Sequence, residues 1–143
     1  MNYQSLKKRI KNNEGFSTTP YKDQLGNLTI GYGHLIKKNE KNFFSKKHNK
    51  IFLNKVFEKD FKEALGSFNK HFDRPKFKSK KTKELFIEMI FQMGIKKVLK
   101  FKKMINLIKN DNKNLAAVEM MNSLWYVQTP KRVENLINNF LHR

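Results

Sequence analysis

The order of apolar and polar residues at the start of the chain predicts one helix followed by a β-hairpin. Apolar residues at helical spacing predict a helix over residues 2–13, and Gly15 is a suitable C-terminal cap for it. Residues 18–34 instead contain the strand formers Thr18, Thr19, Tyr21, Thr29, Ile30 and Tyr32, and the turn-forming pair Gly26-Asn27 separates two strand-like runs. The N-terminal part is therefore expected to hold the β structure of the protein.

The middle of the chain has the pattern of one long helix. Ser45 is a suitable N-terminal cap, the helical pattern continues to about residue 70, and Pro75 breaks it. The apolar positions that recur at helical spacing are Leu53, Phe57, Phe61, Ala64, Leu65, Phe68 and Phe72.

The remainder of the chain is also predicted to be helical. Ser79 is a suitable cap for a helix that carries a dense apolar run and closes at Gly94. Shorter helices are expected near residues 101–109, 114–123 and 131–142.

These elements predict a single domain, residues 1–143, of the α+β class, mostly α, with two lobes. The N-terminal lobe, about residues 14–50, carries a small β-hairpin, and a long connecting helix covers about residues 46–70. The C-terminal helical lobe covers about residues 75–143 and also takes the helix of residues 1–13.

The composition agrees with this class and excludes several kinds of site. Only three Pro and six Gly occur, and 38% of residues are hydrophobic, which is sufficient for a packed core. The absence of cysteine excludes disulfides and thiolate nucleophiles. No second ligand lies at metal-binding spacing from His34, so we expect neither a metal nor another cofactor.

A net charge of +19 is expected to attract polyanions such as nucleic acid, anionic lipid or acidic cell wall. The charge alone does not indicate which of these polyanions is the partner. The abundance of Lys and Asn is equally compatible with an A+T-rich genome. Both interpretations stay open at this point.

Two carboxylates in the N-terminal part have the setting that glycoside hydrolysis requires. Glu14 falls at the C-terminal end of the first helix, where the helix dipole disfavours negative charge, so this group is suited to act as an acid. Asp23 lies in the hairpin, where it is expected to stay ionised, and the hydroxyl of Thr29 across the hairpin is placed to hold a water. Gly31 and Gly33 indicate close approach of a backbone or a ligand. An isolated Glu–Asp pair is more often an ordinary surface residue and a turn residue, so the pair alone is weak evidence.

Three motifs together resemble the T-even phage lysozymes, glycoside hydrolase family 24. Glu-Gly at Glu14 is followed by Tyr-Lys-Asp ending at Asp23 and by Thr-Ile-Gly-x-Gly-His from Thr29. Phe-Gln-Met-Gly at residues 91–94 and Trp-Tyr-x-Gln-Thr-Pro-x-Arg at residues 125–132 follow in the family's order. The resemblance implies a lysozyme-like fold. It also implies an enzyme that hydrolyses the β-1,4 bond between N-acetylmuramic acid and N-acetylglucosamine in peptidoglycan, with inversion at the anomeric carbon. It implies that Glu14 is the general acid, Asp23 the second carboxylate and Thr29 the residue that positions the attacking water.

The resemblance also implies a saccharide groove. Its lining positions correspond to Leu35, Phe91, Met104 and Glu119. The chain departs from the family at Met104 and Glu119, where the family has small polar residues, and ordinary core packing explains Phe91 equally well.

Four further residues are implied to support the site. Arg132 matches a residue that pairs with the acid, which would offset the dipole at Glu14. His34 matches one partner of a structural ion pair with Asp60. Gln92 is expected to accept a hydrogen bond from the indole of Trp125, although a plain core Trp is the simpler alternative.

The stretch between His34 and the long helix is shorter than in the T-even proteins. We therefore expect a reduced lower lobe in which only a two-stranded hairpin remains.

Three alternatives compete with a lysozyme. A nucleic-acid-binding protein would explain the lysine runs at residues 76–83 and 96–103 but leaves the motif around Glu14 unexplained. A lytic transglycosylase needs only one Glu, so the paired Asp23 and Thr29 favour hydrolysis. An inactive lysozyme-like domain would not be expected to keep all three residues.

The expected partners are peptidoglycan and anionic cell-surface polymers, without stable membrane insertion, for a protein that acts as a monomer. Residues 1–13 are polar and basic and lack the apolar region of a signal peptide. The expected location is therefore the host cytoplasm until lysis, and the resemblance implies release to the cell wall through a membrane that a holin opens. A tail-borne lysozyme that acts at entry stays open as an alternative.

Overall fold

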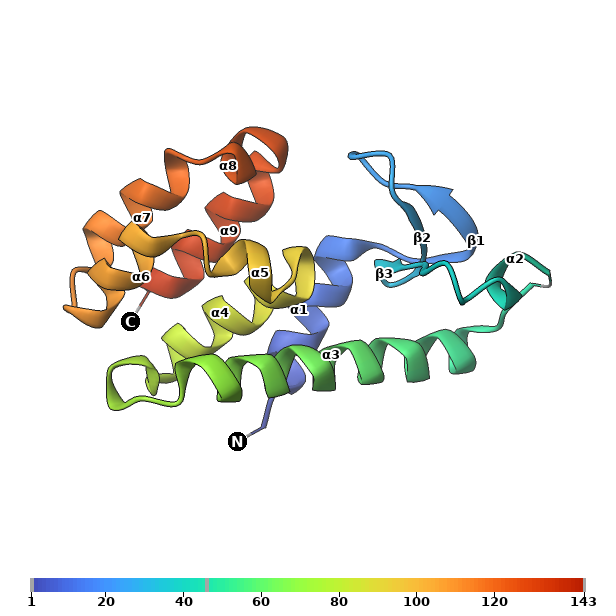
Figure 1. The fold of residues 1–143 in the computed structure, drawn as a ribbon, viewed down its shortest axis with the longest axis horizontal. Coiled ribbons are helices and arrows are strands. Elements are labelled where there is room, and N and C mark those ends of the chain that lie inside the picture. Colours follow the sequence, from blue (N-terminus) through green and yellow to red (C-terminus); the bar gives the residue numbers. More distant parts are fainter. Residues whose placement is uncertain (1, 46, 143) are drawn as a thin grey trace. The chain divides into compact units, whose positions relative to one another are not determined.

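The computed structural model describes residues 2–45 and 47–142 (Figure 1). The chain divides into two compact units, residues 1–63 and 64–143, with the division inside helix α3 (Lys50–Phe72). The prediction placed the first helix with the C-terminal lobe, whereas in the structure this helix belongs to the first unit. Helices dominate and one small antiparallel sheet is present, which confirms a mostly α member of the α+β class.

Helix α1 (Gln4–Glu14) ends as predicted, because the Gly15 N–H donates to the Lys11 carbonyl at 3.0 Å. It begins two residues later than predicted, where the Asn2 Oδ1 accepts from the Gln4 N–H at 2.9 Å. Three contacts fix α1 against the first half of α3: Lys7 with Glu58 at 2.8 Å, Lys11 with Asn54 at 2.5 Å, and the rings of Tyr3 and Phe61 at 5.7 Å.

The sheet has three strands in the order β1 (Ser17–Lys22), β2 (Leu28–Gly31) and β3 (His34–Leu35). The prediction of a two-stranded hairpin was therefore wrong. A tight turn over residues 31–33 returns the chain so that Ile30 pairs with His34. This turn depends on Gly33, whose φ of +76° is a conformation that side-chain-bearing residues rarely adopt.

The long helix starts later than predicted. Ser45 ends a short helix α2 (Asn42–Ser45), and α3 begins at Lys50. The cap is Asn49, whose Oδ1 accepts from the Phe52 N–H at 2.8 Å. The core of this unit joins sheet and helices through the buried residues Ile30, Phe43 and Leu53.

In the second unit, α4 (Lys80–Met93) is the central helix. Ser79 caps it as predicted, because its Oγ accepts from the Thr82 N–H at 3.2 Å. Every residue from Glu84 to Ile90 is buried, so the helix is enclosed on all sides. Phe72 and Phe86 stack at 4.4 Å in an aromatic cluster with Phe68 and Phe77.

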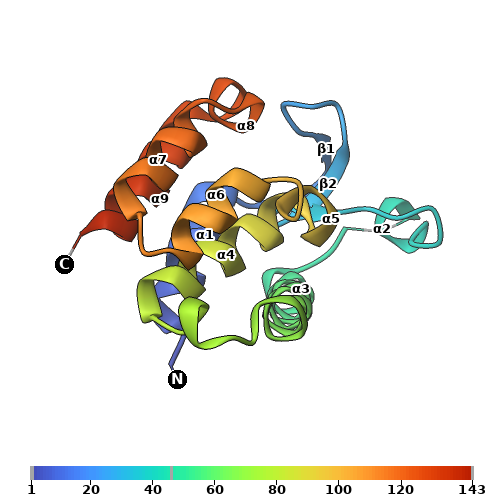
Figure 2. The same ribbon diagram turned by 60° about the vertical axis from the view of Figure 1, so that its left-hand side comes forward.

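The last third contains two short helices that the sequence pattern did not indicate, α5 (Ile95–Val98) and α8 (Leu124–Gln128). The other elements are a 3₁₀ turn η1 (Pro75–Phe77), α6 (Lys102–Lys109), α7 (Lys113–Met121) and α9 (Pro130–Leu141). Pro130 is the first residue of α9, a position where proline's fixed φ suits a helix. Figure 2 shows α7 and α9 side by side, and α9 also packs against α4. No helix in the described part of the chain combines the length and apolar character needed to cross a membrane.

Candidate active site

Glu14 is the last residue of α1, and the turn between β2 and β3 closes directly over its carboxyl group. A Cβ atom built on Gly33 would lie 2.7 Å from Cδ and 3.0 Å from Cγ of Glu14, inside van der Waals contact. Only glycine permits this approach, so the close contact predicted from the glycine pattern is with Glu14 itself. The side chain is held half-buried between a helix end and a tight turn.

Asp23 follows β1 and is held by the loop that connects β1 to β2. Its Oδ1 accepts from the backbone N–H groups of Leu25 at 2.9 Å and Asn27 at 2.8 Å. The Asp23 N–H in turn donates to the Asn27 carbonyl at 2.9 Å. These bonds fix the direction of the carboxylate.

Thr29 lies on β2 directly opposite Tyr21 of β1, so the two side chains share one face of the sheet. Thr29 is 3% exposed, and its hydroxyl donates to the Asn27 carbonyl at 2.9 Å. Because the proton is used there, the hydroxyl oxygen is left as an acceptor for a water molecule.

The phenol of Tyr21 connects the two carboxylates. Burial raises the pKa of Tyr21 above its usual 10.0, and the negative charges of Glu14 and Asp23 raise it further. Two carboxylates on different elements therefore act on one phenol that faces Thr29. Tyr21 and Thr29 therefore lie opposite each other in a region that both carboxylates influence.

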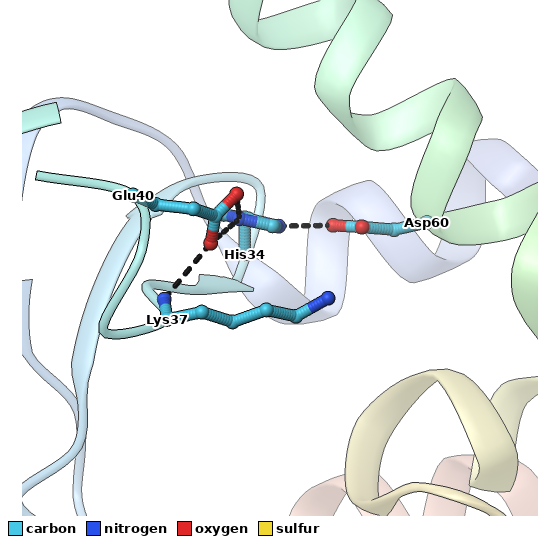
Figure 3. Close-up of polar contacts among 4 residues, drawn as sticks. All are labelled: His34, Lys37, Glu40 and Asp60. Carbon is cyan, nitrogen blue, oxygen red and sulfur yellow. Dashed lines mark hydrogen bonds and ion pairs between the residues drawn. The ribbon is translucent and has the colours of Figure 1, made fainter. Parts of the chain in front are cut away.

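His34 is held by two carboxylates rather than the single one predicted (Figure 3). Its Nδ1 lies 2.7 Å from Asp60 Oδ2, which confirms the predicted pair, and its Nε2 lies 3.0 Å from Glu40 Oε1. The Lys37 N–H also donates to Glu40 at 2.8 Å. Sequence reasoning missed Glu40, because only the third strand and the turn after it bring this residue back to His34.

The ion cluster has opposing electrostatic effects on the imidazole. Burial alone would lower the pKa of His34, but the hydrogen bonds and charges of Asp60 and Glu40 outweigh it and raise the pKa above 6.5. The cluster ties β3 to α3 and so fixes the turn that covers Glu14.

The predicted bond between Trp125 and Gln92 is present. The indole N–H donates to Gln92 Oε1 at 3.0 Å, and the Gln92 amide reaches Thr129 Oγ1 at 3.4 Å. These bonds join α8 and the start of α9 to α4.

Arg132 lies beside Glu88 of α4, with Nη2 at 3.6 Å from Oε2 of a carboxylate that is fully buried. Its predicted pairing with Glu14 stays a prediction. Glu88 lies within the apolar run of residues 85–91. An acidic residue within such a run is itself a signal of a buried ion pair, because an unpaired charge there would be too costly.

The four predicted saccharide-binding residues have different surroundings. Leu35 is 52% exposed at the end of β3, and Phe91 is half-buried on α4. Glu119 is partly exposed and pairs with Lys103 at 3.2 Å. Met104 is only 1% exposed, which argues against a direct saccharide contact and assigns this side chain to the core of its unit. Among the described residues, no group of three His, Cys, Asp or Glu side chains is placed to hold a metal ion.

Comparison with known proteins identifies the family of this chain. The family model described as phage lysozyme matches residues 11–139. A protein of Dictyostelium discoideum named "Probable T4-type lysozyme 2" is 37% identical over 158 aligned positions, covering 95% of this chain and 93% of that protein. A second from the same organism, "Probable T4-type lysozyme 1", is 33% identical over 162 positions, covering 94% and 92%. Because the family model covers most of the chain and both relatives align over almost their full length, the protein belongs to the phage lysozyme family.

Proposed function

We propose that this protein hydrolyses the β-1,4 bond between N-acetylmuramic acid and N-acetylglucosamine by a single displacement that inverts the anomeric carbon. As a member of the phage lysozyme family it is a glycoside hydrolase of the muramidase type, acting on peptidoglycan. The observation that carries the residue assignment is that the β2–β3 turn closes over the Glu14 carboxyl, while the Asn27 carbonyl accepts from both the Asp23 N–H and the Thr29 hydroxyl.

Glu14 donates its proton to the glycosidic oxygen as the bond to the leaving sugar breaks. Asp23, ionised and held by two backbone N–H groups, stabilises the positive charge that develops on the sugar ring. The buried hydroxyl of Thr29 accepts a hydrogen bond from the attacking water, and the water transfers a proton to the Asp23 carboxylate as it attacks C1. Tyr21 lies opposite Thr29 on the sheet, and its phenol is within the electrostatic influence of both carboxylates.

The biological part of the proposal is lysis of a bacterial host. In it the protein acts as a monomer and is released from the host cytoplasm through a membrane that a holin opens. The family resemblance is its support.

The test is the substitution Glu14→Gln, which keeps the shape of the side chain and removes the proton. Turnover of dispersed cell walls should fall by about 10²–10⁴-fold, the usual contribution of a general acid. The matched control is Glu63→Gln, which removes one charge from an exposed position of the same unit and should keep activity. Near-normal activity of Glu14→Gln would contradict the proposal.

The products of the wild-type reaction test the chemistry. Reducing ends without the 1,6-anhydro form indicate hydrolysis, and NMR of the first anomer formed tests inversion. An anhydro product would replace the proposal with a lytic transglycosylase, and the retained anomer would replace single displacement with a covalent intermediate.

A further inference from the structure

The segment from residue 37 to residue 55, here called the α2–α3 corner, combines exposed apolar side chains with a high density of lysine. Phe44, Ile51 and Phe52 are 52%, 74% and 43% exposed. The described lysines of the corner are all exposed: Lys37, Lys38, Lys41, Lys47, Lys50 and Lys55. Glu40 is the single carboxylate in this segment, and it is engaged by His34.

Three rings of the corner pack against one another. Phe43 is buried, and its ring lies 6.1 Å from that of Phe52 and 5.2 Å from that of His48. His48 stacks on Phe52 at 5.1 Å. With Phe43 turned into the core, its neighbour Phe44 on α2 is left at the surface, and α2 lies at the N-terminal end of α3 (Figure 1).

Other lysine-rich or apolar surfaces of the described chain combine these properties less strongly. The lysine run at residues 96–103 exposes one large apolar side chain, Leu99, to 37%. The lysine run at residues 76–83 contains Phe77, but that ring is only 3% exposed. The helices α7 and α8 expose Leu115, Val118, Leu124 and Val127, yet residues 115–127 contain no lysine or arginine. The corner is therefore where a partner with both negative charge and an apolar phase finds complementary groups.

We propose that the α2–α3 corner binds the surface of an anionic phospholipid bilayer. Phe44 and Ile51 enter the boundary between headgroups and acyl chains, where aromatic and aliphatic side chains leave water. The exposed lysines around them contact lipid phosphates, and each lysine near such a surface contributes about fivefold in binding. The protein lies on the membrane without crossing it. This interaction is separate from bond cleavage and does not depend on the proposed enzymatic function.

The experiment measures co-sedimentation of the protein with vesicles of phosphatidylcholine alone or mixed with phosphatidylglycerol. The wild-type protein should bind the mixed vesicles and bind much less to phosphatidylcholine. The double variant Phe44→Ser/Ile51→Ser should lose about tenfold or more in binding, because the apolar area can no longer be buried. The matched control, Leu124→Ser/Val127→Ser, changes side chains that are 69% and 73% exposed and should bind as the wild type does.

A second pair of variants separates the charges of the corner from the total charge. Lys41→Glu/Lys50→Glu should weaken binding strongly, whereas Lys76→Glu/Lys80→Glu has the same net charge and should have a much smaller effect. Melting curves of all four double variants check that each is folded, which is expected since the substituted side chains are exposed.

Insertion is read directly with Phe44→Trp and, as its control, Val127→Trp, using quenching by brominated acyl chains. Quenching in Phe44→Trp that exceeds the quenching in Val127→Trp supports the proposal. Full vesicle binding by Phe44→Ser/Ile51→Ser, or equal loss in the Leu124→Ser/Val127→Ser control, would overturn it. If heparin or DNA binds with the same dependence on Lys41 and Lys50 but Phe44→Trp shows no quenching, the corner is a general polyanion site and the bilayer proposal is wrong.

Discussion

Gly33 determines how closely the β2–β3 turn can approach the carboxyl group of Glu14. Gly33→Ala would place a methyl group 2.7 Å from Cδ of Glu14, so the carboxyl must move. Because small displacements of a catalytic group have large effects on rate, we expect wall hydrolysis to fall by roughly 10²-fold. Assays of kcat and melting temperature on the same preparation measure the two effects.

The control for Gly33→Ala is Gly26→Ala in the β1–β2 loop. Both glycines have positive φ, +76° and +83°, so both substitutions carry a similar backbone cost of about 1 kcal/mol or more. At Gly26 an added Cβ meets nothing within 4 Å. Similar loss of stability but loss of activity only at Gly33 is the expected result. Equal losses of activity would show that the glycines act only through folding.

The ion cluster at His34 predicts a pH-dependent stability. A raised folded-state pKa means that the interaction is fully present below the unfolded value near 6.5 and is lost as pH rises through the folded value. For Glu40, burial alone would raise the pKa, but bonds from the Lys37 N–H and His34 lower it below 4.5. The contribution of Glu40 to folding stability is therefore present above pH 4.5 and is lost as the pH falls through the lowered folded-state pKa.

Glu40→Gln removes one charge of this cluster and tests the pH range over which the cluster stabilises the fold. The variant should be less stable than the wild type by about 1 kcal/mol at pH 6, as for a hydrogen bond to a charged group. The difference should shrink toward high pH, where His34 is neutral in both proteins. Urea unfolding at several pH values measures it, and a difference that grows toward pH 9 would contradict the assignment.

At the scale of elements, the caps decide where helices begin. Ser79 accepts from the Thr82 N–H and so satisfies one of the free donors at the start of α4. Ser79→Ala should lower the free energy of unfolding by about 1 kcal/mol. Activity per folded molecule should be unchanged, since the hydrogen bonds of Ser79 go to Thr82 and not to Glu14, Asp23 or Thr29. A loss of activity without loss of stability would contradict this interpretation.

The predicted elements were most accurate where a local signal acts alone. Ser79 and Gly94 mark α4 correctly, and Gly15 marks the end of α1. The prediction was wrong at Ser45, because Asn49 is an equally good cap and the packing of Phe43 between Ile30 and Leu53 turns residues 42–45 into a separate short helix. Local helix propensity does not indicate which of the two residues, Ser45 or Asn49, caps the long helix.

At the scale of the whole molecule, the net charge of +19 predicts a strong effect of salt on wall lysis. Exposed charges are screened over about 10 Å at 0.1 M salt, so lysis of whole walls should fall steeply from low to moderate salt. Cleavage of a short neutral oligosaccharide should change much less, since attraction to an anionic surface is not involved. Parallel salt dependence of both substrates would place the effect of the charge at the catalytic groove.

The sequence by itself determined the fold class, the main helices and the family. Hydrophobic periodicity and capping residues are local signals, and the motifs around Glu14, residues 91–94 and residues 125–132 are specific in their residue types and spacing. The pairing of His34 with Asp60 and of Trp125 with Gln92 followed from the resemblance, and the structure confirmed both.

Only the tertiary structure decided which groups meet across distant parts of the chain. The third strand, the contact of Gly33 with Glu14 and the second carboxylate on His34 all depend on one turn at residues 31–33, whose return path is set by packing against α3. The burial of Met104 and the pairing of Glu88 with Arg132 likewise depend on how helices pack. Periodicity shows which face of a helix is apolar, but the partner of a buried side chain is fixed by neighbours that the local sequence does not specify.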